Sequence, residues 1–330
     1  MLPCSPVGAA QGVELVCPRC RPEHERVLDA ALTCPGCERT FPSVSVGGGP
    51  SVAVLLDDDD AAAGLGATER ILEGLDEDDF TRYFAADPDH VSALATHGGA
   101  HYGQWMKPPL PSPSLAWIGE ALERVASMPP GPALVLGAAT GAEALCLPPS
   151  RPVVLLDGSV VSLAYASGLA ASDQWLPVQT TPKRFTRRMV ALPEQQRARL
   201  QQFQFLAADA REPPLRPGSF AIVLALNLLD SITHPGVLLH QAQALLAPGG
   251  VLLLSSPFNW DDAVTEPSRR LDADVKPGDD HAEAMEARVQ ALLPRMTLHW
   301  SGRDIPWPLR VHDRLRCEFS LHAMLLVRPG

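Results

Sequence analysis

The stretch ALVLGAATGAEALCL, residues 133–147, decides the fold expected for this chain. An apolar run leads into Gly137, small residues follow, and Gly141 comes four positions later. This pattern is typical of a buried strand that turns into a helix around a nucleotide-like ligand. Two positions depart from the usual form of the pattern. Ala139 stands where a middle glycine is common, and Val135 stands where an acidic residue is often found.

Four further apolar runs follow this stretch, and helical segments separate them. PVVLLDGS reaches Asp157, QFLAADAR reaches Asp209, FAIVLALNLLD reaches Asn227 and Asp230, and GGVLLLSSPFNW follows an APGG turn. Continuous apolar strands that alternate with helices predict a parallel sheet with helices on both faces. HAMLLVR adds a last strand near the C-terminus. The expected fold is therefore α/β and Rossmann-like.

Ligands of such folds bind at the carboxyl ends of the strands, so the residues that follow each strand are the candidates. The small turn at 137–141 lets a ligand approach the backbone. The carboxylate of Asp157 can accept both hydroxyls of a ribose, and that of Asp209 can accept from an adenine amine, with Ala210 leaving room for the ring. The spacing of about 20 residues from the turn to Asp157 also suits a nicotinamide-binding fold. The later strand ends favour S-adenosylmethionine instead.

Residues 131–260 resemble the class I S-adenosylmethionine-dependent methyltransferases. The resemblance implies that Asp157 with its neighbours binds the ribose and that Asp209 and Ala210 flank the adenine. The full set of cofactor-binding residues it implies is Gly137, Ala138, Ala139, Gly141, Asp157, Gly158, Ser159, Asp209, Ala210 and Asn227. The absence of an acid at Val135 removes one contact to the amino group of the cofactor.

Four cysteines near the N-terminus form two Cys-x-x-Cys knuckles, CPRC and CPGC, with 13 residues between them. Two knuckles supply the four sulfurs of a structural zinc site: Cys17, Cys20, Cys34 and Cys37. Disulfides or a redox pair are the alternatives, but disulfides are rare in the cytosol, and a redox site is expected to use a single motif. Cys4 lies outside this pattern.

The segment 13–56 resembles the small zinc-ribbon activator proteins that partner S-adenosylmethionine methyltransferases. The likeness rests on the knuckles and on the steps that follow the second one, namely Phe41-Pro42, Gly49-Pro50 and an apolar strand at 52–56. Activators of this kind add a strand and cover apolar surface, so the fusion implies that an external activator is unnecessary. The DDDD run at 57–60 is interpreted as a solvated linker.

A narrower likeness links the C-terminal half to methyltransferases that act on imidazole nitrogens, including the mercaptohistidine methyltransferases. It rests on three elements: Asn227 to Asp230, Ser256 to Phe258, and Asp304 to Trp307 with Arg310. The Trp-Leu-Gly-Gly step of that group is replaced here by RRLDADVKPGDD. The likeness implies a small-molecule or peptide nitrogen, such as an imidazole, as the methyl acceptor.

The catalytic candidates are His101, Tyr102, Asn227 and Asp230. Methyl transfer from a sulfonium needs alignment above all, and a base only if the acceptor carries a proton. His101 and Tyr102 fall in a segment rich in glycine and proline, 96–114, which we expect to be a loop over the cofactor. Asp230 has the alternative interpretation of a helix N-cap. Trp260, Trp300 and Trp307 are candidates for the wall of an acceptor pocket.

Composition limits the remaining possibilities. The net charge of −11 disfavours a nucleic-acid partner, although the basic stretch 182–200 could bind an anion or form a solvated helix. No apolar run reaches the ~20 residues of a membrane span, and Met1 to Gly12 lacks the pattern of a secretory signal, so we expect a cytoplasmic protein. The expected division is a zinc ribbon at 1–60, a helical lead-in with a covering loop at 61–130, and a methyltransferase domain at 131–330. An RNA or protein methyltransferase, or a non-catalytic scaffold of the same shape, remains an alternative.

Overall fold

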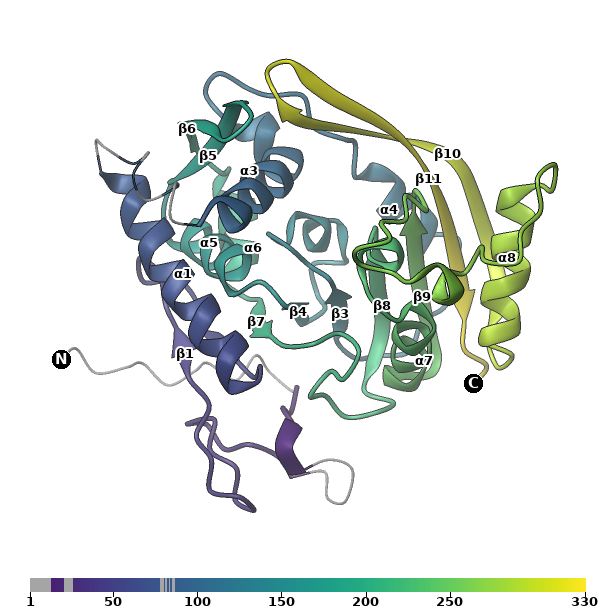
Figure 1. Ribbon diagram of the computed structural model, residues 1–330. Coiled ribbons are helices and arrows are strands. Elements are labelled where there is room, and N and C mark those ends of the chain that lie inside the picture. The colour runs from purple at the N-terminus through teal and green to yellow at the C-terminus, as the bar shows by residue number, and fades with distance from the viewer. Residues whose placement is uncertain (1–12, 21–25, 78–79, 81, 83, 85–86) are drawn as a thin grey trace.

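The computed structural model describes residues 13–20, 26–77, 80, 82, 84 and 87–330, and Cys4 lies outside these ranges (Figure 1). Nine strands of the described chain form one sheet in the order β1-β2-β7-β4-β3-β8-β9-β11-β10. Their bounds are β1 Ser43–Val44, β2 Val52–Val54, β3 Ala133–Leu136, β4 Val153–Asp157, β7 Gln204–Ala207, β8 Phe220–Leu226, β9 Leu246–Ser256, β10 Thr297–His312 and β11 Leu315–Val327.

Helices cover both faces of this sheet, so the predicted fold class is confirmed. The helices are α1 Asp58–Asp76, α3 Pro88–Tyr102, α4 Ala116–Leu122, α5 Val160–Ala171, α6 Glu194–Leu200, α7 Pro235–Leu245 and α8 His281–Leu292. No helix of the described residues is both long enough and apolar enough to cross a membrane.

The central strands are parallel, and the chain order reverses at β3. From β3 the sheet grows through β4 to β7 on one side and through β8 to β9 on the other. β11 and β10 then close the far edge in antiparallel pairing. The carboxyl ends of β3, β4, β7 and β8 therefore meet at one edge of the sheet, which is where a switch in strand order opens a crevice for a ligand.

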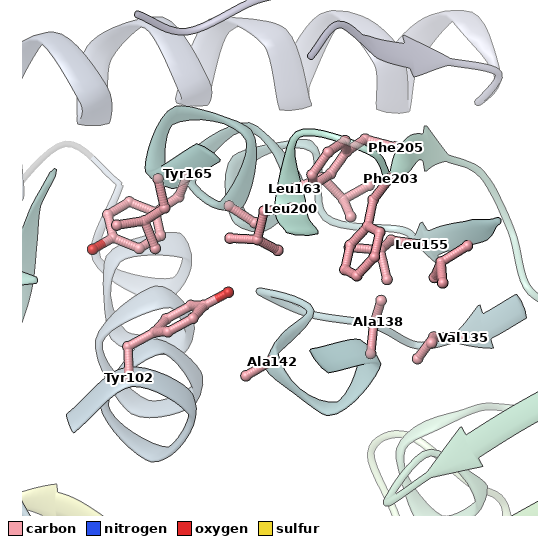
Figure 2. Close-up of a cluster of buried hydrophobic side chains, with 14 of the residues drawn as sticks. Tyr102, Val135, Ala138, Ala142, Leu155, Leu163, Tyr165, Leu200, Phe203 and Phe205 are labelled. Carbon is pink, nitrogen blue, oxygen red and sulfur yellow. The ribbon is translucent and has the colours of Figure 1, made fainter. Parts of the chain in front are cut away.

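The strands of the centre are buried on both faces, which explains their uninterrupted apolar sequences. Side chains alternate between the faces with the period of two that a strand imposes. Ala133 and Val135 of β3 belong to the core beneath α5, whereas Leu134 and Leu136 belong to the core beneath α7. Figure 2 shows part of the first core, where Val135 lies near Ala138 and Leu155. Val135 is thus a packing residue.

The N-terminal segment that holds the cysteines continues the sheet. Val52, Ala53 and Val54 of β2 pair in parallel with Phe205, Leu206 and Ala207 of β7, and β1 pairs in turn with β2. Apolar side chains of this segment also join the core beneath α7: Leu15, Leu28, Leu32, Phe41 and Leu55. The segment therefore lengthens the sheet by its own strands and shares its core.

The acidic run at 57–60 is the start of a helix and not a linker. Asp57 is the N-cap of α1, and its carboxylate accepts a hydrogen bond from the backbone N–H of Asp60. Carboxylates in the first turn interact favourably with the positive end of the helix dipole. Asp58 also forms ion pairs with Arg19 and Arg39 of the cysteine-bearing segment. These contacts compensate for the mutual repulsion of the four acids.

The segment 96–114 differs from the predicted loop, because its first part completes helix α3. Gly98 permits this, since a Cβ atom at this position would lie 2.6 Å from a methyl of Leu176 in strand β5, Gln174–Thr181. The glycine therefore allows α3 to pack closely on β5, and that contact outweighs its low helix propensity. The helix ends at Tyr102, ahead of the prolines that begin at Pro108.

The basic stretch 182–200 also differs from the predicted solvated helix in its first half. β6, Arg184–Val190, pairs with β5 as a two-stranded hairpin, and only Glu194–Leu200 is helical. Arg187 donates hydrogen bonds to the carbonyls of Leu75 and Glu77, and its guanidinium lies over the ring of Trp175. This side chain is thus committed to contacts inside the protein.

Candidate active site

The turn after β3 keeps the backbone shape of a glycine-rich loop despite its altered sequence. Gly137 has φ +68°, Ala139 φ +44° and Gly141 φ +78°. A Cβ atom on Gly137 would come within 2.7 Å of a methyl of Leu228. Ala139 adopts a left-handed conformation that costs an L-residue about 1–2 kcal/mol, and its N–H donates to Asp157 Oδ2 at 2.7 Å.

Asp157 ends β4 and ties the two neighbouring loops together. Besides the bond from Ala139, its Oδ1 accepts a hydrogen bond of 2.7 Å from the N–H of Ser159. Burial raises the pKa of Asp157, although these two N–H donors counteract the rise and the negative charge of Glu143 adds to it. The carboxylate is held in place and keeps lone pairs for a ligand.

Two adjoining cavities open at this edge of the sheet, and Gly137, Asp157, Ser159, Leu228 and Ser231 line both of them. The outer cavity has a volume of about 650 Å³ and lies between the ends of β4, β7 and α1. Its walls include the predicted cofactor residues Gly158, Asp209 and Ala210, together with Leu56 ahead of α1 and with Asp60, Ala63 and Gly64 from its first turns.

Asp209 in the outer cavity is already engaged by Arg211. Nε of Arg211 donates to Oδ1 of Asp209 at 3.0 Å and to Oδ2 at 2.9 Å. Nη2 of Arg211 donates to Oδ2 at 2.5 Å. Partial burial alone would raise the pKa of Asp209, but the charge and hydrogen bonds of Arg211 hold it below its usual range. A purine amine can therefore use only the lone pairs that Arg211 leaves free.

The inner cavity has a volume of about 350 Å³ and collects polar side chains from three elements. His97 and His101 come from α3, Glu143 from the short helix after the glycine turn, and Asn227 and Asp230 from the end of β8. Glu143, Asp157 and Asp230 are carboxylates, whereas no Lys or Arg lies among the described residues of its lining. The cavity has the electrostatic character that favours a cationic ligand.

His101 is buried, and both of its ring nitrogens have partners. Nε2 lies 2.6 Å from Glu143 Oε1, and Nδ1 lies 2.7 Å from the hydroxyl of Thr140. The neighbouring Tyr102 is fully buried, and its hydroxyl donates to the carbonyl of Thr140 at 2.5 Å. The end of α3 is thus fastened to the glycine turn. Tyr102 does not line either cavity, and burial raises its pKa further above the ordinary tyrosine range.

Asn227 and Asp230 are brought together with the turn, as expected. Asn227 has φ +52°, a left-handed conformation that asparagine tolerates well, and its Oδ1 accepts from the hydroxyl of Ser255 at 3.0 Å. Its amide NH₂ group is left as the donor. Asp230 Oδ2 accepts from the N–H of Asn259 at 2.7 Å. Burial raises the pKa of Asp230, and the N–H of Asn259 counteracts the rise only in part.

The hairpin of β10 and β11 forms the roof of the inner cavity, which Trp307, Leu309 and Phe319 line. Two hydrogen bonds join this hairpin to β5. Arg310 donates to the carbonyl of Gln179 at 2.8 Å, and the N–H of Asp313 donates to the carbonyl of Thr180 at 3.2 Å. Figure 1 shows this hairpin reaching from the C-terminal edge of the sheet toward β5 and β6. Of the three candidate tryptophans, Trp260 and Trp300 do not line the cavity.

The family assignment follows from a match over most of this region. Residues 112–324, about two thirds of the chain, match the family model described as a methyltransferase domain. The chain belongs to this methyltransferase family. The match covers the sheet from β3 to β10 and most of β11, whereas α1 and α3, which also line the cavities, precede the matched region. No curated protein is similar enough to the chain to match it.

Solved structures similar to this methyltransferase are distant in sequence. The [4+2]-cyclase SpnF shares 13% identity over 65% of this chain and 80% of its own, with a TM-score of 0.42. A complex between the Haloferax volcanii Trm112 methyltransferase activator and the putative methyltransferase shares 14% over 77% and 99%, with a TM-score of 0.39. The N-methyltransferase NodS from Bradyrhizobium japonicum WM9 shares 15% over 65% and 95%, also at 0.39. Similarity at this level says nothing about the substrate.

The four cysteines of the N-terminal segment form the cluster that their spacing predicts. Their sulfurs all lie within 4.8 Å of one another, with 3.7 Å between Cys17 and Cys37 and 3.6 Å between Cys20 and Cys34. Tetrahedral zinc with bonds of about 2.3 Å separates its sulfurs by about 3.8 Å. These donors fit such an ion, which would tie the two knuckles together.

Several residues of the site were not predicted from the sequence, above all Glu143, Arg211 and Asn259. Glu143 is the only charged residue in the stretch 133–147, and a lone acid in an apolar segment was the signal that could have found it. Two predicted cofactor residues, Ala138 and Gly141, are buried in the turn and do not line the cavities. They shape the loop, whereas Gly137 and Ala139 face the cleft.

Proposed function

We propose that this methyltransferase uses S-adenosylmethionine and transfers its methyl group to a nitrogen atom of a small molecule. The inner cavity carries the proposal, because its described lining places three carboxylates and no Lys or Arg beside the turn after β3. A ligand with a sulfonium and an ammonium group is favoured by such a field. The cleft is also divided in a way that suits this ligand, with the outer cavity for a nucleoside and the inner one for the reacting centre.

The residues of the outer cavity would hold the adenosine part. Asp157 would accept from the ribose hydroxyls with the lone pairs that its bonds to Ala139 and Ser159 leave free. Ala210 would contact the adenine, and Asp209 would accept from its amine. Leu228, which lines both cavities, would lie between the nucleoside and the reacting centre.

The residues of the inner cavity would hold and deprotonate the acceptor. When bound, the cofactor supplies a methyl group whose bond to sulfur breaks as the lone pair of the acceptor nitrogen forms the new bond. The amide NH₂ of Asn227 would orient the acceptor, and Asp230 would take the proton that leaves its nitrogen. Both nitrogens of His101 are occupied, so this residue would act by positioning Glu143 and the turn.

An imidazole compound is the proposed class of acceptor. Trp307 and Phe319 line the same cavity as Asn227 and Asp230, so a flat ring would have aromatic side chains to stack on and polar groups to bind its nitrogens. The hairpin bonded to β5 roofs the cavity, which favours a small molecule over a folded protein or an RNA strand. The net charge of −11 favours the same choice.

We also propose that the N-terminal segment is a zinc ribbon that replaces an external activator. Without it, β7 would expose a row of unpaired backbone groups. β2 satisfies that edge, and the short β1 ends the sheet beyond it. A partner that adds a strand would find this edge already taken. The division at residues 60 and 130 and a cytoplasmic location remain part of this proposal.

Calorimetry with S-adenosylmethionine and S-adenosylhomocysteine tests the proposal. We expect binding of both ligands and a loss of at least about tenfold for Asp157→Ala, since a hydrogen bond to a charged group contributes about 1.5–3 kcal/mol. Absence of binding at millimolar ligand would favour a scaffold. Transfer of labelled methyl to a panel of imidazole compounds then tests the acceptor class. Transfer only to RNA, with binding that falls steeply with salt, would refute the small-molecule assignment.

A further inference from the structure

The side chain of Glu143 has one carboxylate oxygen, beside the inner cavity, that lacks a partner in the described part of the chain. It is 7% exposed, and its Oε2 has no hydrogen-bond partner among the described residues. A buried carboxylate oxygen without a partner is unfavourable, so it marks a place where a donor or a cation is expected to bind. Neither the proposed methyl transfer nor the packing of the turn uses this oxygen.

The contacts of Glu143 hold it rigidly. Its Oε1 is bonded to His101, and His101 is bonded to Thr140 of the glycine turn. A neutral imidazole satisfies both bonds, because Nε2–H donates to the carboxylate while Nδ1 accepts from the Thr140 hydroxyl. These bonds pair Oε1 of Glu143, whereas its Oε2 stays without a hydrogen-bond partner among the described residues. Tyr102 clamps the same turn through the carbonyl of Thr140.

The position of Glu143 assigns it to the cofactor side of the cavity. It follows Gly137 and Ala139 on the same turn, whereas the acceptor residues come from β8 and from the hairpin roof. The strand that leads into the turn carries no acid of its own. Val135 stands where an acid is common, and its side chain is buried in the core beneath α5. Of the three carboxylates that line the cavity, Asp157 is proposed to bind the ribose and Asp230 to act on the acceptor, which leaves Glu143 for the ammonium of a methionine moiety.

We propose that the Oε2 atom of Glu143 binds the α-ammonium group of the cofactor and replaces the acid absent at Val135. This inference rests on the proposed function, since it assigns a residue to the same ligand. His101 is then a positioning residue, which aims the carboxylate toward the cavity. An ammonium at this place neutralises a charge that would otherwise repel Asp157.

Calorimetry with two ligands separates this role from a general one. S-adenosylhomocysteine carries the α-ammonium group, whereas 5′-methylthioadenosine has the same nucleoside and sulfur but no amino-acid part. In Glu143→Gln we expect affinity for S-adenosylhomocysteine to fall about 10- to 100-fold, the range of a charge-assisted hydrogen bond. Affinity for 5′-methylthioadenosine stays within about twofold. Glutamine keeps the size of the side chain and an oxygen that can accept from His101.

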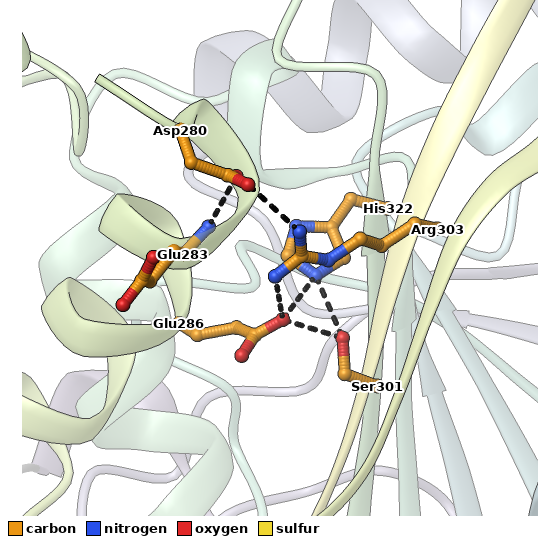
Figure 3. Close-up of polar contacts among 6 residues, drawn as sticks. All are labelled: Asp280, Glu283, Glu286, Ser301, Arg303 and His322. Atoms are coloured by element: carbon orange, nitrogen blue, oxygen red, sulfur yellow. Dashed lines mark hydrogen bonds and ion pairs between the residues drawn. The ribbon is translucent and has the colours of Figure 1, made fainter.

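Glu286→Gln is the matched control. Glu286 is likewise bonded to a buried histidine, with Oε1 3.1 Å from His322 Nε2, and it also accepts from Ser301 at 2.6 Å. Figure 3 shows that Glu286 joins α8 to β10 through Ser301 and Arg303 and to β11 through His322, and that Arg303 also pairs with Asp280 at the N-cap of α8. It lies outside both cavities, so we expect both affinities to stay at the wild-type value.

Each other outcome overturns the assignment. Unchanged affinity for S-adenosylhomocysteine in Glu143→Gln would show that Oε2 does not contact the ammonium. An equal loss for both ligands would make Glu143 a structural residue of the turn. A rise only in the KM of the acceptor would move the contact to the acceptor. If the wild-type protein binds 5′-methylthioadenosine and S-adenosylhomocysteine equally, the assignment fails while the proposed use of the cofactor stands. If it binds neither, the proposed function fails.

Discussion

Replacement of Gly137 by alanine tests the close contact that closes the cofactor turn. The residue has φ +68°, and a Cβ atom would lie 2.7 Å from a methyl of Leu228. Gly218 offers a matched control, because its φ of +71° is nearly the same and nothing lies within 4 Å of its Cβ position. The pair separates the cost of backbone conformation from the cost of packing.

The expected magnitudes follow from these two geometries. A left-handed alanine costs about 1–2 kcal/mol, and the lower entropy of the unfolded chain returns about 0.4–1 kcal/mol. Gly218→Ala should therefore lower the free energy of unfolding by about 1 kcal/mol. Gly137→Ala adds the cost of overpacking, about 1–3 kcal/mol, for a total of about 2–4 kcal/mol. Leu228 is half-buried and lines both cavities, so its displacement narrows the cleft.

Urea unfolding and calorimetry with S-adenosylhomocysteine measure the two effects. We expect Gly137→Ala to lose more stability than Gly218→Ala and to bind the ligand at least about tenfold more weakly, a change of about 1.4 kcal/mol. Gly218→Ala should bind like the wild type. Equal destabilisation in the two variants, or wild-type affinity in Gly137→Ala, would refute the conclusion that the contact with Leu228 shapes the cleft.

Three further predictions concern the turn, the cysteines and the proposed base. Ala139→Gly removes a left-handed alanine, so urea unfolding should show a gain of up to about 1 kcal/mol, and a loss would contradict the positive φ. Cys34→Ser should lower both the zinc content, measured by mass spectrometry, and the melting temperature. It should also weaken binding of S-adenosylhomocysteine, because the cysteine-bearing segment pairs with Asp58 at the start of α1, and later residues of α1 line the outer cavity. A variant that loses zinc but keeps its affinity would exclude this coupling. Burial raises the pKa of Asp230, so the stability that its protonated form contributes is present at low pH and lost as pH rises through that raised pKa. Only the ionised form is a base, so kcat should fall as pH falls through the same pKa, and Asp230→Asn should lower kcat and remove this acidic limb; an unchanged profile would exclude Asp230 as the base.

The sequence predicts the central strands well because both faces of each strand are buried. A strand buried on both faces needs an uninterrupted apolar run, and such a run stands out from the helices around it. The polar residues at strand ends were equally visible, so Asp157, Asn227 and Asp230 were predicted at the edge where they now meet. The helix that ends at Tyr102 could not be predicted in this way. Its glycines are typical of a loop in the sequence. Only the structure shows that Gly98 allows close packing of the helix on Leu176.

The parts of the site that escaped prediction depend on where side chains point. Arg211 is two residues from Asp209, and nothing in that spacing shows that the two side chains meet in the outer cavity. Glu143 lies on a short helix after the turn. Its side chain meets His101 of α3, and a contact between segments this far apart in the chain cannot be read from the sequence. The bonds of His101 and Tyr102 to Thr140 escaped prediction for the same reason, since an exposed side chain and a buried one look alike in sequence.

The altered glycine pattern now has a physical interpretation. Ala139 holds the left-handed conformation that the missing glycine would adopt, and the bond from its N–H to Asp157 helps to offset the strain. The turn therefore keeps its shape at a modest cost in stability. Loss of the acid at Val135 is a different kind of change, because it removes a charge and not a conformation. A carboxylate on the same turn can restore that charge, and Glu143 lies within reach of the inner cavity with one oxygen unused. The two departures from the pattern are thus independent, so Ala139→Gly should change stability more than affinity, and Glu143→Gln the reverse.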